Sequence, residues 1–199
     1  MAGDVNSLEA LLQLEGAPSS DFDLNKDVRL PEGRKLRPAA VLLGVEGEGA
    51  SATVLLTKRS SRLKHHPGQI ALPGGKVDEG DAGTIGAALR EAQEEIGMPM
   101  PVAQILGTLP PHETVTGYLV TPVVARITGS FPFQPEPGEV DEVFRVPFSH
   151  LMDASRYRVE ARNWQGRPRR FYAVPYGPYY IWGATARIFR SLADRAAQL

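Results

Sequence analysis

The chain of 199 residues is 42% hydrophobic and 23% charged, which is typical of one globular domain. Its formal net charge of −1 excludes a general electrostatic attraction to nucleic acid or to a membrane surface. Without cysteine, the chain forms neither disulfides nor thiolate metal sites. No stretch resembles a signal peptide or a membrane span, so we expect a cytoplasmic protein.

Residues 1–35 are predicted to form an N-terminal arm, and residues 36–199 a single folded domain, because the apolar pattern changes near Arg37. Within the arm, a partial apolar stripe predicts one short helix, and the remainder is polar and irregular. The stripe consists of Leu8, Leu11, Leu12 and Leu14. There is no internal repeat, and no linker is long enough to divide the core.

Two runs rich in Val and Leu, 38–45 and 51–59, flank the turn sequence EGEGA and predict a β-hairpin. A basic loop, SSRLKHHPGQ, connects the hairpin to the run IALPGG. From residue 82 to residue 96 the pattern becomes helical, with an apolar stripe expected opposite the glutamates. The stripe consists of Ile85, Ala88, Leu89, Ala92 and Ile96. Asp81 is the expected N-cap, and Gly97 with Pro99 ends this helix.

Further strands are predicted at 102–109, 116–127 and 140–146, with a Pro-rich surface loop before the last. A short helix at 147–153 precedes a second hairpin, whose strands are 157–164 and 169–174. A closing helix is expected from residue 182 onward. Together these elements predict an α+β fold with a mixed β-sheet and a central helix.

The central helix carries three carboxylates within the sequence LREAQEEIG, namely Glu91, Glu94 and Glu95. Helical geometry directs them into one arc of about 100°, where like charges repel by roughly 0.2–0.5 kcal/mol per pair. A divalent cation, Mg²⁺ or Mn²⁺, would neutralise this repulsion. We predict Glu91 and Glu95 as direct ligands, Glu94 as a further or bridging ligand, and a backbone carbonyl at Gly75 as another.

The stretch GGKVDEGDAGTIGAALREAQEEIGM resembles the Nudix box, G-x5-E-x7-R-E-U-x-E-E-x-G-U, in which U is a bulky aliphatic residue. The matching residues are Gly75, Arg90, Glu91, Glu94, Glu95, Gly97 and Met98. This chain departs in having Asp81 at the first acidic position, eight residues rather than seven before Arg90, and a small Ala92 at a U position. The resemblance implies a Nudix-type α/β/α sandwich, in which Arg90 orients the first glutamate through an ion pair.

The upstream stretch LLTKRSSRLKHHPGQIALPGG is similar to the element that precedes the box in the coenzyme A pyrophosphatase branch of that family. Lys64 stands where that pattern has Arg, and Leu72 where it has Phe. The same branch tolerates a box that is one residue longer. The resemblance therefore implies hydrolysis of the coenzyme A diphosphate to adenosine 3′,5′-bisphosphate and 4′-phosphopantetheine.

Substrate contacts are expected from Arg59, Arg62, Lys64 and Gly74. The basic loop suits the extra 3′-phosphate of coenzyme A, although a solvated turn is an equally good interpretation. A second basic cluster, with the same potential use, consists of Arg167, Arg169 and Arg170. The general base is either a glutamate of the box or a carboxylate on a distant loop, for which the candidates are Glu113, Glu139 and Glu142.

Two other functions stay open at this point: hydrolysis of ADP-ribose or another nucleoside diphosphate derivative, and binding of a nucleotide without catalysis. The intact R-E-x-x-E-E sequence argues against the pure binder, which has no need of the carboxylates. His65 and His66 are assigned to a loop or phosphate role, and His112 and His150 to structural or exposed positions. A small-molecule substrate is the expected partner, with neither nucleic acid nor membrane, and a homodimer is compatible with the sequence.

Overall fold

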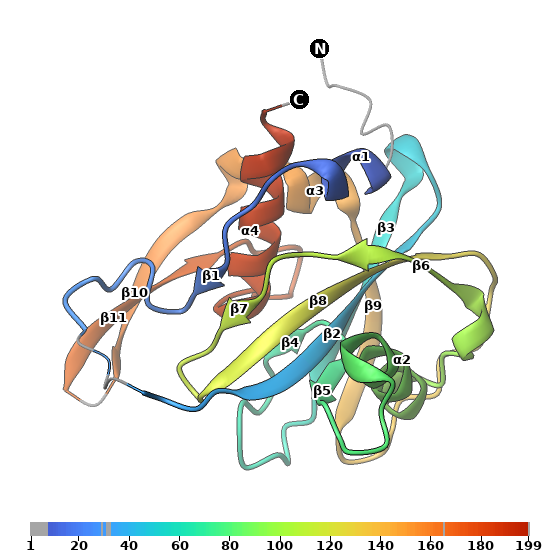
Figure 1. The fold of residues 1–199 in the computed structure, drawn as a ribbon, viewed down its shortest axis with the longest axis horizontal. Helices are drawn as coiled ribbons and strands as arrows, with labels where there is room; N and C mark the ends of the chain where they lie inside the picture. The colour runs from blue at the N-terminus through green and yellow to red at the C-terminus, as the bar shows by residue number, and fades with distance from the viewer. Residues whose placement is uncertain (1–7, 29, 31–32, 165, 199) are drawn as a thin grey trace.

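A mixed β-sheet with helices on both faces organises the molecule, which is described here as a computed structural model (Figure 1). The structure describes residues 8–28, 30, 33–164 and 166–198. The helices are α1 Leu8–Gln13, α2 Gly83–Ile96, α3 Phe148–Met152 and α4 Ala184–Ala196. The strands are β1 Ser19–Ser20, β2 Arg37–Glu46, β3 Thr53–Arg59, β4 Ile70–Ala71, β5 Gly74–Lys76, β6 Ala103–Thr108, β7 His112–Glu113, β8 Tyr118–Ile127, β9 Val140–Pro147, β10 Arg158–Trp164 and β11 Arg167–Ala173. The predicted α+β fold with a mixed sheet and a central helix is confirmed.

Strand β2 lies at the centre of the sheet and is parallel to β8 along its whole length. On its other side it pairs with β3 only at Val45 and Glu46, so the predicted hairpin is confirmed but short. Beyond this pairing β2 and β3 diverge. Strand β5 pairs with β2 at residues 39–41, while β9 and β4 pair with β3. Because β2 and β3 diverge, the glycine-containing strand β5 can pair with β2.

Apolar residues of β2 face both sides because helices cover both faces of the sheet. Ala40 and Leu42 belong to the core under α2, whereas Leu43 and Val45 belong to the core under α1, α3 and α4. This alternation follows from the two-residue period of a strand. The uninterrupted apolar run at 38–45 is therefore the sequence signature of a two-faced core.

Helix α2 differs from its predicted form in two respects. The residue before it is Ala82, which makes no side-chain cap, so the prediction of Asp81 as N-cap is wrong. Ile85 is 39% exposed, so its assignment to the buried stripe is also wrong. Ala88, Ala92 and Ile96 of that stripe are buried as predicted, and Ala87 is buried in addition, since small side chains let the helix lie close to the sheet. The predicted end is confirmed, because Gly97 has a left-handed φ of 72°.

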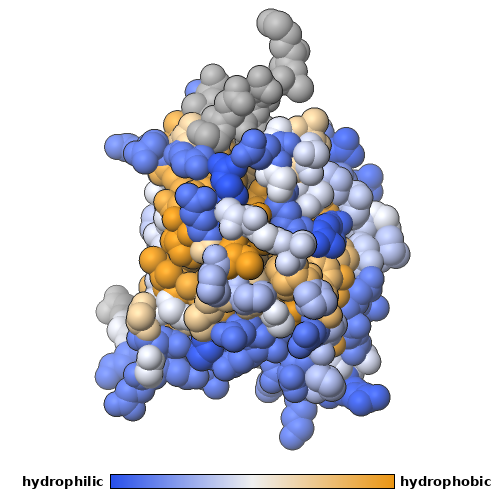
Figure 2. All heavy atoms as spheres, turned by 90° about the vertical axis from the view of Figure 1, so that its right-hand side faces the viewer, coloured by the Kyte–Doolittle hydropathy of each residue, from blue (hydrophilic) through white to orange (hydrophobic). Residues whose placement is uncertain are grey.

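The side of the molecule that carries β6, α2 and the 128–139 loop has two kinds of surface. Hydrophilic atoms form the lower margin of this face, and apolar atoms gather above it (Figure 2). Phe131 and Phe133 make an edge-on pair at 5.4 Å and pack against the core under α2. None of the helices in the described ranges is long and apolar enough to cross a membrane.

The N-terminal arm packs onto the rest of the chain. Its predicted short helix is confirmed as α1, with Leu8 and Leu11 buried against the core that α3 and α4 share. Strand β1 then pairs in parallel with β7, opposite His112 and Glu113. Arg126 on β8 also pairs with Glu9, at 3.1 Å. These contacts bury apolar arm residues, which stabilises the folded state.

Leu11→Ala tests whether the arm is part of the cooperative fold. Leu11 is 1% exposed, and its truncation is expected to lower the free energy of unfolding by about 2–5 kcal/mol. Urea unfolding followed by circular dichroism measures this change. Leu30→Ala, at an exposed position, is the control and is expected to have little effect. A single unaltered transition for Leu11→Ala would show that the arm folds separately.

Candidate active site

The glycine pair of β5 brings backbone unusually close to β2. Gly74 has a φ of 156°, and a Cβ there would lie 2.3 Å from the Ala40 carbonyl oxygen. Because any side chain would collide with the β2 backbone, only glycine lets β5 enter between the diverging strands. The amide of Gly74 then points toward α2, where it donates a hydrogen bond to Glu95 Oε2 at 3.1 Å.

Glu95 is the most deeply buried carboxylate of the helix, with 4% of the residue exposed. Its other oxygen, Oε1, lies 3.8 Å from Arg59 Nη1. Burial raises the pKa of Glu95 to about 7, and the negative charges of Glu91 and Glu139 contribute to the same shift. The hydrogen bond from Gly74 and the charge of Arg59 act in the opposite direction without reversing it. Glu95 therefore sits in a position that disfavours its ionised form unless a cation is near.

Glu91 lies one helical turn before Glu95 and packs against the second glycine. A Cβ at Gly75 would lie 2.3 Å from Glu91 Oε1, so the carboxylate occupies the space that a side chain there would fill. Burial raises the pKa of Glu91, and the charges of Glu94 and Glu139 add to the effect. Gly74, Gly75, Glu91 and Glu95 thus form one small group that carries negative charge, called the Glu91–Glu95 recess from here on.

Arg90 links the carboxylates to the loop before the helix. Its guanidinium binds both oxygens of Asp81, at 2.9 and 3.0 Å, and donates to Glu91 Oε1 at 3.0 Å and Glu94 Oε2 at 2.9 Å. Asp81 also accepts a hydrogen bond from the Asp78 amide at 2.7 Å, which closes the loop. The role of Asp81 is therefore to anchor Arg90, and the hydrogen bonds from Arg90 keep the pKa of Asp81 below its usual value.

The three glutamates of the helix do not share one environment. The side chain of Glu94 is 57% exposed and is held by Arg90, whereas Glu91 and Glu95 lie against the glycines. Over the described residues, no three histidine, aspartate or glutamate side chains converge closely enough to hold a metal ion by themselves. Mg²⁺ typically takes only one or two carboxylates and keeps several waters. The Glu91–Glu95 recess fits that requirement, because both pKa values are raised and a cation would offset the accumulated negative charge.

The Pro-rich loop before β9 is anchored to the end of α2, which its composition did not predict. The amides of Gln134 and Glu136 donate to the carbonyls of Ile96 and Glu95, both at 3.0 Å, and so satisfy the helix terminus. A Cβ at Gly97 would lie 2.7 Å from Gln134 Cβ, so the loop can dock only against glycine. These contacts bring Glu139 near enough for its charge to raise the pKa values of Glu91 and Glu95.

The other two candidates for a distant base are engaged elsewhere. Glu113 pairs with Arg34, and Glu142 accepts a hydrogen bond from the Tyr179 hydroxyl at 2.5 Å. The charge of Glu139, by contrast, raises the pKa values of both Glu91 and Glu95. Its backbone is held at the end of β3 by the Ser60 amide, which donates to the Glu139 carbonyl at 2.8 Å.

The predicted basic residues divide into three groups. Arg59 lies in the recess beside Glu95, while Arg62 and Lys64 are exposed on the connecting loop. Arg167, Arg169 and Arg170 lie on β11, which Figure 1 shows on the opposite side of the molecule from α2. Arg169 is also paired with Asp21 of the arm at 2.9 Å.

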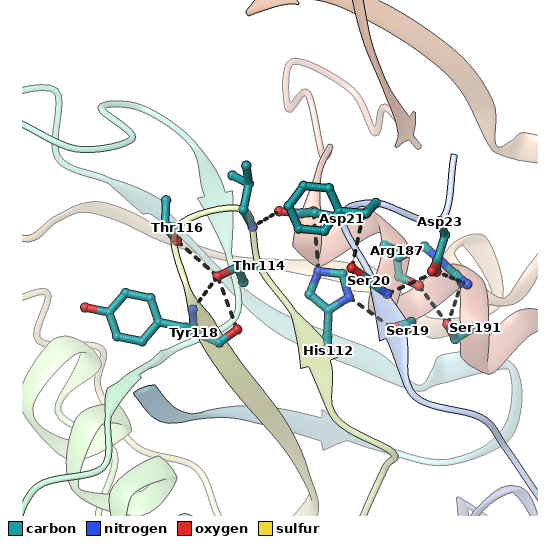
Figure 3. Close-up of polar contacts among 12 residues, drawn as sticks. Ser19, Ser20, Asp21, Asp23, His112, Thr114, Thr116, Tyr118, Arg187 and Ser191 are labelled. Carbon is teal, nitrogen blue, oxygen red and sulfur yellow. Dashed lines mark hydrogen bonds and ion pairs between the residues drawn. The ribbon is translucent and has the colours of Figure 1, made fainter. Parts of the chain in front are cut away.

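His112 and His150 have structural contacts, as expected. His112 on β7 is buried against the arm, with Nδ1 2.9 Å from Ser19 Oγ and Nε2 3.4 Å from Asp21 (Figure 3). The Nε2 atom of His150 lies 3.0 Å from the Pro175 carbonyl. In the described part of the chain neither ring contributes to the recess formed by Glu91 and Glu95.

Comparison with known sequences identifies close relatives. A family model described as the NUDIX domain matches residues 35–169. A protein from Enterobacter sp. (strain 638), named "Uncharacterized Nudix hydrolase NudL", is 44% identical over 157 residues, which cover 79% of this chain and 81% of the relative. A protein of the same name from Salmonella paratyphi B is 40% identical over 174 residues, covering 87% and 90% of the two chains.

Solved structures with low sequence identity share the fold. The Nudix hydrolase RenU from M. Smegmatis has a TM-score of 0.54 at 21% identity, covering 83% of this chain and 88% of its own. The MutT protein from Methanosarcina mazei Go1 has a TM-score of 0.53 at 20% identity, covering 85% and 100%. Both comparisons agree with the sheet and helix arrangement described above.

Gly75→Ala is expected to disable the recess without unfolding the protein. The added methyl group would displace the Glu91 carboxylate, because only 2.3 Å separates the two positions. The rise in Tm on addition of Mg²⁺ or Mn²⁺ should therefore fall by at least half. Gly80→Ala is the matched control, since a Cβ there meets nothing within 4 Å. Equal metal responses of the two variants would contradict the assignment.

The pKa of Glu95 predicts how stability depends on pH in the metal-free protein. Since the pKa rises from 4.5 to about 7 on folding, ionisation of Glu95 disfavours the folded state as the pH increases through this window. Glu95→Gln removes that penalty, so the variant should be more stable than the wild type by about 2–3 kcal/mol at pH 8. The difference should shrink toward pH 5.

Urea unfolding in EDTA at a series of pH values measures the Glu95→Gln difference. Glu94→Gln, which removes an exposed carboxylate from the same helix, is the control. A stability difference for Glu95→Gln that is constant between pH 5 and pH 8 would contradict the raised pKa.

Proposed function

The chain belongs to the NUDIX domain family, and from that premise we propose that this Nudix hydrolase cleaves the diphosphate bond of coenzyme A and its derivatives. The products would be adenosine 3′,5′-bisphosphate and 4′-phosphopantetheine. The observation that carries the proposal is the recess in which Glu91 and Glu95 face the Gly74–Gly75 backbone. Its accumulated negative charge suits a divalent cation, and hydrolysis of a phosphoanhydride needs such a cation.

The residues of this chain would hold the cation in a defined arrangement. We assign Glu91 and Glu95 as ligands, with Glu94 and the Gly75 carbonyl as further ligands. Mg²⁺ or Mn²⁺ bound there would polarise the phosphoryl oxygens and lower the pKa of a water molecule. Arg90 supports the assignment, because its bidentate pairing with Asp81 leaves one nitrogen to orient both Glu91 and Glu94.

Glu139 is our candidate for the general base. It is a loop-borne carboxylate whose charge acts on both proposed ligands, and its loop is tied to the end of α2. A general base must come within hydrogen-bond reach of the attacking water. The anchoring of the loop through the Ile96 and Glu95 carbonyls holds Glu139 beside the recess and supports this role.

The choice of coenzyme A as substrate rests on the segment before the glycines, which resembles the coenzyme A pyrophosphatase branch. The structure divides its basic residues into Arg59 at the recess and the exposed pair Arg62 and Lys64. An exposed cationic pair on the loop that follows Arg59 supports binding of the 3′-phosphate, which plain ADP-containing compounds lack. Arg59 instead suits the diphosphate or the orientation of Glu95, and we assign it to substrate binding at that end together with Gly74.

A substrate panel tests the activity directly. The protein is incubated with Mg²⁺ and coenzyme A, ADP-ribose, NADH or a diadenosine compound, and the products are separated by chromatography. Coenzyme A should give the highest kcat/KM, and Glu95→Gln should lower kcat by at least about 100-fold, in line with loss of a metal ligand. Turnover of no compound would refute the enzymatic proposal. Faster cleavage of ADP-ribose would leave a Nudix hydrolase of different specificity.

Replacement of Arg62 and Lys64 by Ala tests recognition of the 3′-phosphate. Loss of charge-assisted contacts should raise KM for coenzyme A by about tenfold or more and leave KM for 3′-dephospho-coenzyme A nearly unchanged. Lys26→Ala with Arg156→Ala removes the same charge at exposed positions on other elements and serves as control. Equal changes in KM for the two substrates would exclude a 3′-phosphate contact at these residues.

A further inference from the structure

A cavity of about 190 Å³ lies between the N-terminal arm and helix α4. Arm residues 16–19 line one side, α4 lines another, and the connection from β6 to β7 contributes Leu109 and Pro110. In Figure 1 the arm and α4 lie together, on the opposite face of the sheet from α2. None of the residues that form the proposed active site lines this cavity. The cavity is therefore separate from the Glu91–Glu95 recess.

Arg195 lines the cavity and is only 7% exposed. One terminal nitrogen, Nη2, donates to the carbonyls of Leu11, at 3.0 Å, and Leu14. Its Nε is buried and has no hydrogen-bond partner among the described residues. No ion pair within the described ranges engages its guanidinium either. Hydrogen bonds to two carbonyls account for the position of Nη2, but they leave the charge and Nε uncompensated.

The neighbouring charges do not neutralise Arg195. Asp194 is bound by Arg190 at 2.8 Å, and Asp23 is bound by Arg187 at 2.6 Å. Asp194, which lines the cavity, and Asp23 thus each have an arginine of their own, and the charge of Arg195 is in excess. Because an unpaired buried charge is costly, a bound anion would lower the free energy of the folded state.

Other polar side chains line the cavity and are hydrogen-bonded within the protein, since Ser191 Oγ donates to the Arg187 carbonyl at 3.1 Å and Ser19 Oγ lies 2.9 Å from His112 Nδ1. Figure 3 shows Ser19 on the arm and Arg187 with Ser191 on α4, and all three line the cavity. Arg187 Nη1 donates to Ser191 Oγ at 2.6 Å, so a second guanidinium is held rigidly at the wall. A volume of 190 Å³ is below the range of about 300–1,000 Å³ that holds drug-sized ligands. The space therefore suits a small ion.

Gly16 of the arm lies against the side chain of Arg195. A Cβ at this position would lie 3.0 Å from both Cζ and Nε of Arg195, so the arm backbone packs directly against the guanidinium. The arm and helix α4 therefore contact each other at the Arg195 guanidinium. An anion bound beside it would connect the two elements through shared contacts.

We propose that this cavity binds a small tetrahedral oxyanion of the phosphate type, held by the Arg195 guanidinium with Arg187 and the serine hydroxyls at its walls. The bound ion neutralises the buried charge and reinforces the packing of the arm on α4. This site is independent of the proposed hydrolysis, since it shares no residue with the active-site recess.

Titration of the ¹⁵N-labelled protein with inorganic phosphate, followed by NMR, tests the proposal. Saturable shifts are expected for the amides of residues 16–19 and of α4, and for the Arg195 Nε–H signal. Phosphate that binds only at Arg59, Arg62 or Lys64 would instead shift signals of β3 and the following loop. Absence of shifts around Arg195 up to 50-fold excess phosphate over protein, or shifts confined to β3 and that loop, would overturn the proposal.

Two variants and one control make the test specific. Arg195→Met should weaken phosphate binding at the cavity by about tenfold or more. Ser191→Leu fills the cavity without changing Arg195 and should abolish the same shifts, which keeps the test valid if Arg195→Met does not fold. Arg156→Met, at an exposed position, removes one charge elsewhere and should leave the titration unchanged. Binding to Ser191→Leu with wild-type affinity would also overturn the proposal.

Glycerol phosphate, sulfate and acetate define the class of anion. Shifts with phosphate and sulfate but not with acetate would support a tetrahedral oxyanion. A response to glycerol phosphate at comparable concentration would extend the site to small phosphate monoesters. Equal responses to all four anions, acetate included, would contradict selectivity for the tetrahedral shape.

Discussion

The close approach of the Gly74–Gly75 backbone to β2 is the constraint on which the candidate active site depends. A single Cβ at Gly74 would collide with the Ala40 carbonyl, and one at Gly75 would occupy the place of the Glu91 carboxylate. With both side chains absent, β5 enters where β2 and β3 diverge. Its backbone amide then reaches Glu95 on α2. Sheet topology and the position of the carboxylates are thus consequences of the same two glycines.

The charges around the recess are organised by arginine. Arg90 ties Glu91 and Glu94 to the loop through Asp81, and Arg59 lies beside Glu95. These pairings do not fully compensate the carboxylates, because the pKa values of Glu91 and Glu95 are still raised by burial and by their neighbours. The carboxylates are therefore held in place but retain uncompensated negative charge. This suits a site that binds a cation together with an anionic substrate. The cavity at Arg195 has the opposite imbalance, an excess of positive charge.

Most elements follow from periodicity and turn residues, because these signals are local. The long strands β2, β3, β6, β8 and β9, the second hairpin and helices α1, α3 and α4 lie where the apolar patterns predict them, whereas the short strands β1, β4, β5 and β7 were not predicted. The errors at α2 have tertiary causes. Ile85 is exposed because the helix contacts the sheet through its alanines, and Asp81 turns away from the helix end because Arg90 is within reach. Neither competing interaction is visible in a pattern of apolar residues.

The amino-acid sequence by itself determined the candidate ligands, the arginine between them and the glycines before them, because their spacing along one loop and one helix is a local property. It also contained the arm helix and the basic loop. Tertiary structure alone decided which glutamate is buried, that the charge of Glu139 acts on Glu91 and Glu95, and that the second basic cluster lies elsewhere. It likewise decided that Arg195 is buried between arm and helix with no carboxylate among the described residues to pair with it. The physical reason is that burial and electrostatic interaction depend on distances across the fold, and chain spacing sets those distances only within one element.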